Sequence, residues 1–84
     1  MKYRLTYTQR AARDFRGLQS STKERIGKTL QRYAEDPMKY AEKLSDARLG
    51  TYRFRIGAYR IIFDLEEDEI VILRVGHRTG IYKK

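Results

Sequence analysis

The chain has 84 residues, which predicts a single domain over residues 1–84 with one thin core and no deep catalytic cavity. Its 19 Lys and Arg outnumber 11 Asp and Glu, and the net charge of +8 predicts a polyanionic partner such as nucleic acid, an acidic protein or an anionic membrane. It has no Cys and one His, which excludes a disulfide scaffold, a thiolate zinc site, a cysteine nucleophile and a histidine pair within one chain. Because the sequence shows no signal peptide and no run of about 20 apolar residues, we expect a cytoplasmic protein that does not cross a membrane.

The first half of the chain predicts a strand followed by two helices. Residues 2–7 alternate between apolar or aromatic and polar side chains, as in a half-buried strand. Thr8 is a suitable N-cap for a helix from about Gln9 to Leu18. The sequence Ser21–Glu24 is typical of a capping box, and Asp36-Pro37 ends the second helix. The short turn between the helices predicts an antiparallel hairpin.

The second half predicts three strands after a polar connection over residues 38–47. Residues 52–56 and 59–65 alternate and are joined by Gly57-Ala58, which suits a type II′ turn. Residues 70–75 are almost wholly apolar, which favours a central, buried strand. The order β-α-α-β-β-β predicts an α+β fold, in which a helical hairpin covers one face of a mostly antiparallel sheet and leaves the other free to bind.

Positive charge concentrates in the half of the chain that forms these strands. The acidic side chains of residues 66–69 are consecutive and diverge, which predicts a solubilising turn and not a cation site. Arg53 and Arg55 are two residues apart, so they share the face opposite the apolar positions of their strand. A solvated strand face would explain them. However, arginines without acidic partners repel one another unless an anion binds, and the guanidinium group suits phosphate.

Three further residues near these strands each have two interpretations. Alternation places Arg60 on the open face, as a phosphate ligand or as an arginine that bonds backbone carbonyls at a strand edge. His77 follows Gly76, which permits a bend, a bulge or a close backbone approach. It is the one side chain whose ordinary pKa lies near neutrality, so it is either a proton-transfer group or a structural residue. Tyr82 is either a packing residue or an aromatic that stacks on a base.

Several segments occur in a characteristic order and spacing along essentially the whole chain. They are Tyr3–Thr8 with Ala11–Phe15, then Tyr52–Phe63, the acidic turn, Leu73–Arg78 and the near-terminal Ile81-Tyr82. Together they resemble the RelE/ParE toxin superfamily. This resemblance implies a RelE-like fold and a toxin of a bacterial or archaeal toxin–antitoxin pair. RelE-type members cut mRNA in the ribosomal A site, whereas ParE-type members poison DNA gyrase.

The resemblance also implies roles for individual residues. Arg53 and Arg55 match two basic strand positions, and Arg60 matches a phosphate-binding arginine. Some RelE members have lysines at the first two positions, one of which can act as a base. Arginine stays protonated, with a pKa above about 12, so these two side chains are expected to clamp phosphate. Arg78 matches the arginine after the fourth strand, Tyr82 matches the near-terminal tyrosine that stacks on the substrate base, and His77 matches a commonly basic position. The candidate catalytic residues are therefore Arg53, Arg55, Arg60, His77, Arg78 and Tyr82, and the further candidate RNA-binding residues are Arg48, Arg74, Lys83 and Lys84.

The main functional hypothesis is an endoribonuclease that needs no metal or other cofactor, because the sequence lacks a suitable ligand set. Its expected partners are the ribosome and mRNA, a RelB-like antitoxin, and operator DNA only through the antitoxin complex. A gyrase-directed toxin and a basic module that binds RNA without cutting it remain alternatives. Membrane binding is not expected, because neither helix opposes a basic face to a bulky apolar one.

Overall fold

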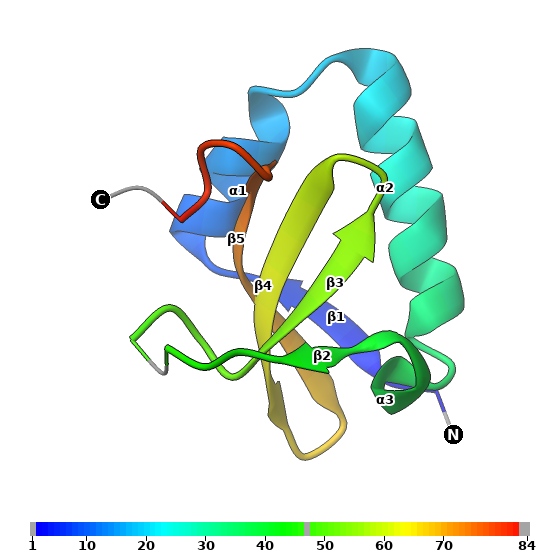
Figure 1. Cartoon of the computed structure of the whole chain (residues 1–84). Helices are drawn as coiled ribbons and strands as arrows, with labels where there is room; N and C mark the ends of the chain where they lie inside the picture. The colour runs from blue at the N-terminus through cyan, green and yellow to red at the C-terminus, as the bar shows by residue number, and fades with distance from the viewer. Residues whose placement is uncertain (1, 47, 83–84) are drawn as a thin grey trace.

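The computed structural model describes residues 2–46 and 48–82. Its elements are β1 (Arg4–Tyr7), α1 (Gln9–Arg16), α2 (Ser20–Tyr33), α3 (Pro37–Tyr40), β2 (Glu42–Lys43), β3 (Tyr52–Ile56), β4 (Tyr59–Glu66) and β5 (Glu69–His77). The strands form one sheet in the order β1-β5-β4-β3-β2 (Figure 1). β1 pairs with β5 in parallel, and every other pair of neighbours is antiparallel. This confirms the expected α+β fold.

The core lies between the helices and one face of the sheet. It contains alternate residues of β3, β4 and β5 together with the inner residues of α1 and α2, namely Ala11, Ile26, Leu30, Ala34, Phe54, Ile56, Ile61, Phe63, Ile70, Ile72 and Val75. The rings of Phe54 and Phe63 stack with their centroids 4.2 Å apart. Burying each large side chain contributes about 1.5–3 kcal/mol. The central position expected for residues 70–75 is confirmed, because β5 lies between β1 and β4.

The first helix begins as the sequence predicts, whereas the second does not. The Thr8 Oγ1 atom accepts a hydrogen bond from the Ala11 amide at 3.1 Å, so Thr8 is the N-cap of α1. This helix ends at Arg16 and not at Leu18. The capping box predicted at Ser21–Glu24 is wrong, because α2 begins at Ser20 and its N-cap, Gln19, makes no side-chain hydrogen bond. The earlier start places Ser21 inside the first turn, where it cannot act as the cap.

The connection predicted over residues 38–47 contains two short elements. Pro37 occupies the first turn of α3, where its missing amide hydrogen costs nothing. Tyr40 in this turn stacks on Tyr33 of α2 with ring centroids 4.0 Å apart. β2 then pairs with β3 and sets Glu42 opposite Arg53. The short helix thus anchors the chain to α2 and brings β2 to the edge of the sheet.

The strand irregularities differ in part from the prediction. Gly57 has a φ of 60° and Ala58 has no positive φ, as a type II′ turn requires. The bulge falls at Leu73, since Ile62 pairs with Arg74 and Phe63 with Ile72. Gly76 instead lets the Ile81 side chain lie close to the backbone of β5, because a Cβ atom at Gly76 would be 3.4 Å from Ile81 side-chain atoms.

The second face of the sheet is only partly open. Ile62 and Ile81 are buried on this side, outside the main core. The loop before β3 packs closely against this face of the sheet, since a Cβ atom on Gly50 would lie 2.6 Å from Cγ2 of Ile62. The expectation of a wholly free face is therefore wrong, and the accessible part is the strip around β3 and the end of β4. Within residues 2–46 and 48–82, no helix combines the length and apolar character needed to cross a membrane.

Candidate functional site

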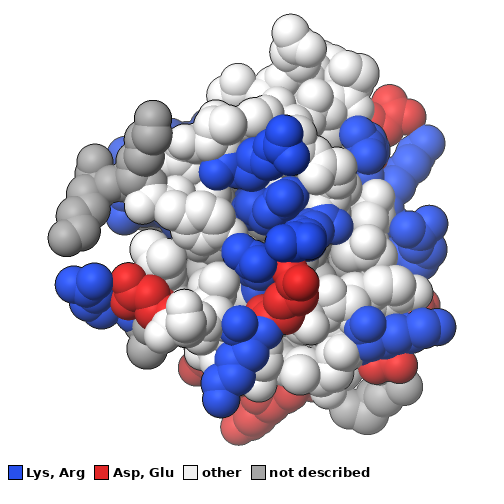
Figure 2. Space-filling model, viewed as in Figure 1, with Lys and Arg blue, Asp and Glu red and all other residues white. Residues whose placement is uncertain are grey.

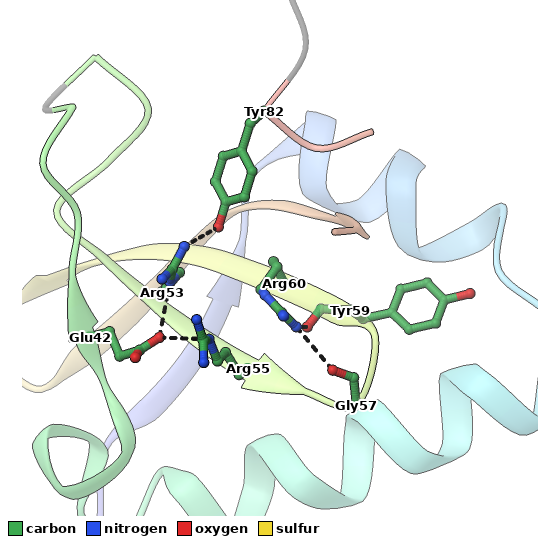
Figure 3. A network of polar contacts seen from close by, with 7 residues as sticks. All are labelled: Glu42, Arg53, Arg55, Gly57, Tyr59, Arg60 and Tyr82. Carbon is green, nitrogen blue, oxygen red and sulfur yellow. Dashed lines mark hydrogen bonds and ion pairs between the residues drawn. The ribbon is translucent and has the colours of Figure 1, made fainter. Parts of the chain in front are cut away.

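Three arginines lie along this strip, of which Arg55 is exposed, Arg53 half-buried and Arg60 buried. Arg55 of β3 is the register partner of Arg60 in β4, so the two side chains share a face with Arg53. We call these residues, with Glu42 and Tyr82, the arginine cluster (Figure 3). In Figure 2, Lys and Arg side chains gather over the centre of this face and surround one acidic group. The sheet therefore presents positive charge where the helices do not cover it.

Glu42 bridges the two arginines of β3. Its Oε1 atom accepts a hydrogen bond from Nε of Arg53 at 3.0 Å and lies 3.0 Å from Nε of Arg55. The expectation that these arginines lack an acidic partner is therefore wrong. The partner escaped prediction because β2 has two residues, too few to show a periodic pattern. The only sequence signal was a lone Glu eleven residues before Arg53.

Tyr82 reaches the cluster from the far end of the chain. Its hydroxyl oxygen accepts a hydrogen bond from Nη1 of Arg53 at 2.7 Å. This bond, together with the contact to Glu42, raises the pKa of Arg53 above its ordinary value despite partial desolvation. The Tyr82 side chain remains exposed, so its ring is available for stacking.

Arg60 adopts the second of its two predicted roles. It is 9% exposed, and its Nη1 atom donates to the carbonyl oxygens of Gly57 at 2.9 Å and Tyr59 at 2.8 Å. These bonds hold it at the end of an interior strand and not at a sheet edge. Its Nε and Nη2 atoms make no hydrogen bond within the described residues. Because no fully buried side-chain nitrogen there lacks a partner, neither atom is completely shielded from solvent.

His77 does not lie with the arginine cluster. It pairs with Tyr59 across the strands, and their rings meet edge to face at 5.5 Å. Tyr59 packs against the core on the helix side, and its ring points away from the cluster in Figure 3. His77 therefore shares the opposite face of the sheet. Its Nδ1 atom lies 2.8 Å from Oγ1 of Thr79.

Arg78 lies beside the turn that joins β3 and β4. Its backbone amide donates to the carbonyl oxygen of Ala58 at 2.8 Å, which fixes the chain after β5 next to the turn. The Arg78 side chain is exposed and makes no polar contact within the described residues. It is thus available to a ligand at the Arg60 end of the cluster.

The further candidate RNA-binding residues Arg48 and Arg74 bond carboxylates outside the arginine cluster. Arg48 pairs with Asp46, with its Nε 3.1 Å from Oδ1. Arg74 donates from Nε to Oδ2 of Asp14 at 2.8 Å. Both arginines line one surface pocket, which also contains Tyr82. Lys83 and Lys84 lie outside the described residues.

The arrangement provides donors for an anion and one acceptor for a proton. Arg53 and Arg55 offer planar guanidinium groups, the geometry that suits phosphate oxygens. Glu42 is the carboxylate in contact with both. In the described part of the chain, no three His, Asp or Glu side chains gather in a way that could hold a metal ion.

Comparisons with known proteins assign this chain to a family. The model of a family described as "ParE toxin of type II toxin-antitoxin system, parDE" matches residues 5–82. Toxin RelG of Mycobacterium tuberculosis is 30% identical to this chain over 91 residues, and the similarity covers 100% of each protein.

Solved structures agree with the sequence similarity. A chain of the toxin–antitoxin complex RelBE2 from Mycobacterium tuberculosis matches with a TM-score of 0.83 and 26% identity, covering 93% of this chain and 100% of that one. The isolated RelE toxin of E. coli matches with a TM-score of 0.73 and 26% identity, covering 89% and 83%. The family model spans nearly all of this chain, and the chain therefore belongs to the ParE toxin family, within the RelE/ParE toxins of type II toxin–antitoxin systems.

Proposed function

We propose that this toxin is a ribosome-dependent endoribonuclease that cleaves mRNA in the A site and arrests translation. The observation that carries this proposal is the contact of Glu42 with both Arg53 and Arg55, beside the Tyr82 hydroxyl. The cluster combines hydrogen-bond donors that can bind phosphate, a proton acceptor and an exposed aromatic ring. Cleavage by the neighbouring ribose hydroxyl can use each of these groups.

In the proposed reaction the 2′-oxygen forms a bond to the adjacent phosphorus, and the bond from phosphorus to the 5′-oxygen breaks. Glu42 accepts the proton of the 2′-hydroxyl, because the arginines of the cluster stay protonated. His77, the proton-transfer group expected from the sequence, lies on the other face of the sheet. Water protonates the departing 5′-oxygen, to which Arg78 donates a hydrogen bond, and the hydroxide that remains takes the proton from Glu42.

The arginines stabilise the negative charge that grows on the phosphate oxygens. Removing one such electrostatic contact typically lowers the rate by about 10²–10³. Tyr82 stacks on the base next to the cleaved bond. The ribosome holds the RNA in the reactive orientation, a contribution of roughly 7–11 kcal/mol in well-oriented reactions. This division of labour predicts weak cleavage of RNA without ribosomes.

The partner that restrains the toxin is, in this proposal, a RelB-like antitoxin. Two solved relatives are toxin–antitoxin complexes, RelBE2 of Mycobacterium tuberculosis and RelBE of E. coli. Acidic residues of such a partner would neutralise the arginine cluster. Contact with operator DNA would come through the antitoxin complex. The toxin would act in the cytoplasm, where ribosomes are found.

Primer extension on a reporter mRNA in a purified translation system tests the function. The native chain, Arg53→Gln, Arg78→Ala and the control Arg13→Gln would be compared with and without ribosomes. Arg13 is exposed on α1 and lies outside the cluster. We expect cuts only with ribosomes, unchanged for Arg13→Gln and about 10²–10³-fold slower for the two other variants. Equal cleavage of free RNA would contradict ribosome dependence.

A second candidate function is inhibition of DNA gyrase without nuclease activity. The match to a family model described as a ParE toxin favours it. Growth arrest on expression, inhibition of gyrase supercoiling and absence of mRNA cuts would together establish this function. Growth arrest that persists in an Arg60→Ala, Arg78→Ala double variant would point the same way.

A further inference from the structure

We propose that the surface pocket beside the arginine cluster binds the neighbouring nucleotide of the same RNA strand. We call it the Arg10 pocket. Its charged walls come from three separate elements, Arg10 of α1, Arg48 of the loop before β3 and Arg74 of β5. The pocket has a volume of about 310 Å³, at the small end of the range for small-molecule sites. This inference rests on the proposed function, because it takes RNA as the ligand.

The positive charge of the Arg10 pocket is only partly neutralised. The carboxylate in its lining is Asp46, which accepts from the Arg48 backbone amide at 3.0 Å and from the side-chain Nη2 at 3.1 Å. Arg74 uses Nε to bond Asp14, and its Nη atoms make no hydrogen bond within the described residues. Arg10 makes no polar side-chain contact there either. The pocket thus has three arginines and one carboxylate, Asp46, in its lining. A second carboxylate, Asp14, contacts Arg74 from outside the lining.

The remaining walls favour a nucleotide over a simple anion. They are formed by Leu49, Ile81 and Tyr82, so an apolar and aromatic surface adjoins the arginines. A phosphate would contact the guanidinium groups while a sugar or base covers the apolar wall. Inorganic phosphate or a carboxylate side chain would leave that wall exposed to water.

Tyr82 connects the Arg10 pocket to the arginine cluster. Its side chain lines the pocket, and its hydroxyl accepts the hydrogen bond from Arg53 at 2.7 Å. A strand with one phosphate at Arg53 and Arg55 would pass over Tyr82 and place its next nucleotide in the pocket. The two sites then bind consecutive units of one strand.

The test measures binding of a fluorescein-labelled 2′-O-methyl RNA octamer, which cannot be cleaved, by fluorescence anisotropy at several salt concentrations. The native chain would be compared with Arg10→Gln, Arg48→Gln and Arg53→Gln. Arg13→Gln is the matched control, because it removes the same charge from the same helix outside the pocket. Circular dichroism would verify that each variant is folded.

Each lost phosphate contact to a single strand makes the negative slope of log K against log salt shallower by about 0.7. We expect this change for Arg10→Gln and Arg53→Gln, a smaller one for Arg48→Gln because its charge is paired with Asp46, and none for Arg13→Gln. Equal slopes for Arg10→Gln and Arg13→Gln would overturn the pocket proposal. If Arg53→Gln also matched Arg13→Gln, the proposed function would fail with it.

Competition identifies the chemical class of the ligand. A 2′-O-methyl dinucleotide should displace the octamer at lower concentration than inorganic phosphate does, and Arg10→Gln should narrow that difference. Equal potency of phosphate and dinucleotide would overturn the assignment to a nucleotide. Displacement by hexaglutamate at lower concentration than by the dinucleotide would assign the pocket to an acidic protein segment and also overturn it.

Discussion

At the scale of single residues, Glu42 reduces the positive charge of the arginine cluster and, in the proposed reaction, accepts the proton. Its carboxylate faces Arg53 and Arg55 where the proposal places a phosphate. An incoming phosphate must therefore compete with Glu42 for the same guanidinium groups. The same residue opposes substrate binding and, in the proposed reaction, accepts the proton.

The variant Glu42→Gln separates these two effects. It removes one negative charge and the proton acceptor while keeping the size of the side chain. We expect the 2′-O-methyl octamer to bind more tightly and single-turnover mRNA cleavage on ribosomes to slow by about 10²–10⁴, the usual contribution of a general base. Tighter binding with an unchanged cleavage rate would show that Glu42 only neutralises the cluster.

Asp14 links α1 to β5, and its contribution to stability can be measured by unfolding in urea. Its Oδ2 atom accepts from Nε of Arg74 at 2.8 Å and from the Val75 amide at 3.0 Å, beyond the end of the pairing with β1. We expect Asp14→Asn to lower the free energy of unfolding in urea by about 1–3 kcal/mol, because part-buried donors lose a charged acceptor. The control is Glu24→Gln, which breaks an exposed pair with Lys28 and should cost below about 0.5 kcal/mol.

At the scale of elements, the turn between β3 and β4 positions both Arg60 and Arg78. The Gly57 carbonyl accepts from Arg60, and the Ala58 carbonyl accepts from the Arg78 amide. Gly57 itself has a φ of 60°, and a Cβ atom there would lie 2.7 Å from Nη2 of Arg25. The turn thus depends on glycine for its backbone conformation and for the space that Arg25 occupies.

Gly57→Ala should therefore destabilise the protein by about 1–2 kcal/mol, the cost of a left-handed conformation for a residue with a Cβ atom. Arg25 can move aside, so the backbone term dominates. Gly27→Ala is the matched comparison, because Gly27 lies inside α2 with open space around it. We expect that change to stabilise by about 0.5–1 kcal/mol. Unfolding of both variants in urea measures these changes. Equal changes in the free energy of unfolding would contradict this account of the turn.

The longer elements were predictable from the sequence, and the shortest were not. Strands β3 and β4 alternate over enough residues to reveal their buried face, and Thr8 marks the start of α1. A two-residue strand such as β2 and a single turn such as α3 have no period of their own. They form because they pack or pair with neighbouring elements, as Tyr40 of α3 stacks on Tyr33 of α2.

The same limit applies to the candidate site. The two-residue spacing of Arg53 and Arg55 predicted their common face, which the strand geometry dictates. The contact of Arg53 with Tyr82 joins residues 29 apart and depends on how the chain folds back after β5. Glu42 reaches the cluster only through β2. No local pattern fixes the face of His77, whose place follows from its pairing with Tyr59.

At the scale of the whole molecule, the net charge of +8 is confined to a small volume. The principal extents are 30 × 29 × 23 Å. The Debye length is about 30 Å at 0.01 M salt and about 8 Å at 0.15 M. At low salt every charge therefore interacts with every other one, whereas at 0.15 M only neighbours do.

Raising NaCl from about 0.01 M to about 0.15 M should therefore raise the melting temperature, because screening weakens the repulsion between distant cations. We expect a rise of at most about 4–8 °C, which corresponds to 1 kcal/mol in a domain of this size. The double variant Lys2→Glu, Arg13→Glu has a net charge of +4, from +8 − 4, and should show a smaller rise. Calorimetry of both proteins measures the difference. A melting temperature that falls with salt would mean that attractive ion pairs outweigh the net charge.

The parallel pairing of β1 with β5 has a consequence for the timing of synthesis. Tyr7 pairs with Ile72, so β1 is synthesised well before β5, the strand that satisfies its edge. Tyr82, which completes the contact with Arg53, is added later still. A ribosome translating this message thus carries an unfinished sheet and an unfinished cluster. Under the proposed activity, a nascent chain that has not yet reached Tyr82 lacks part of its arginine cluster.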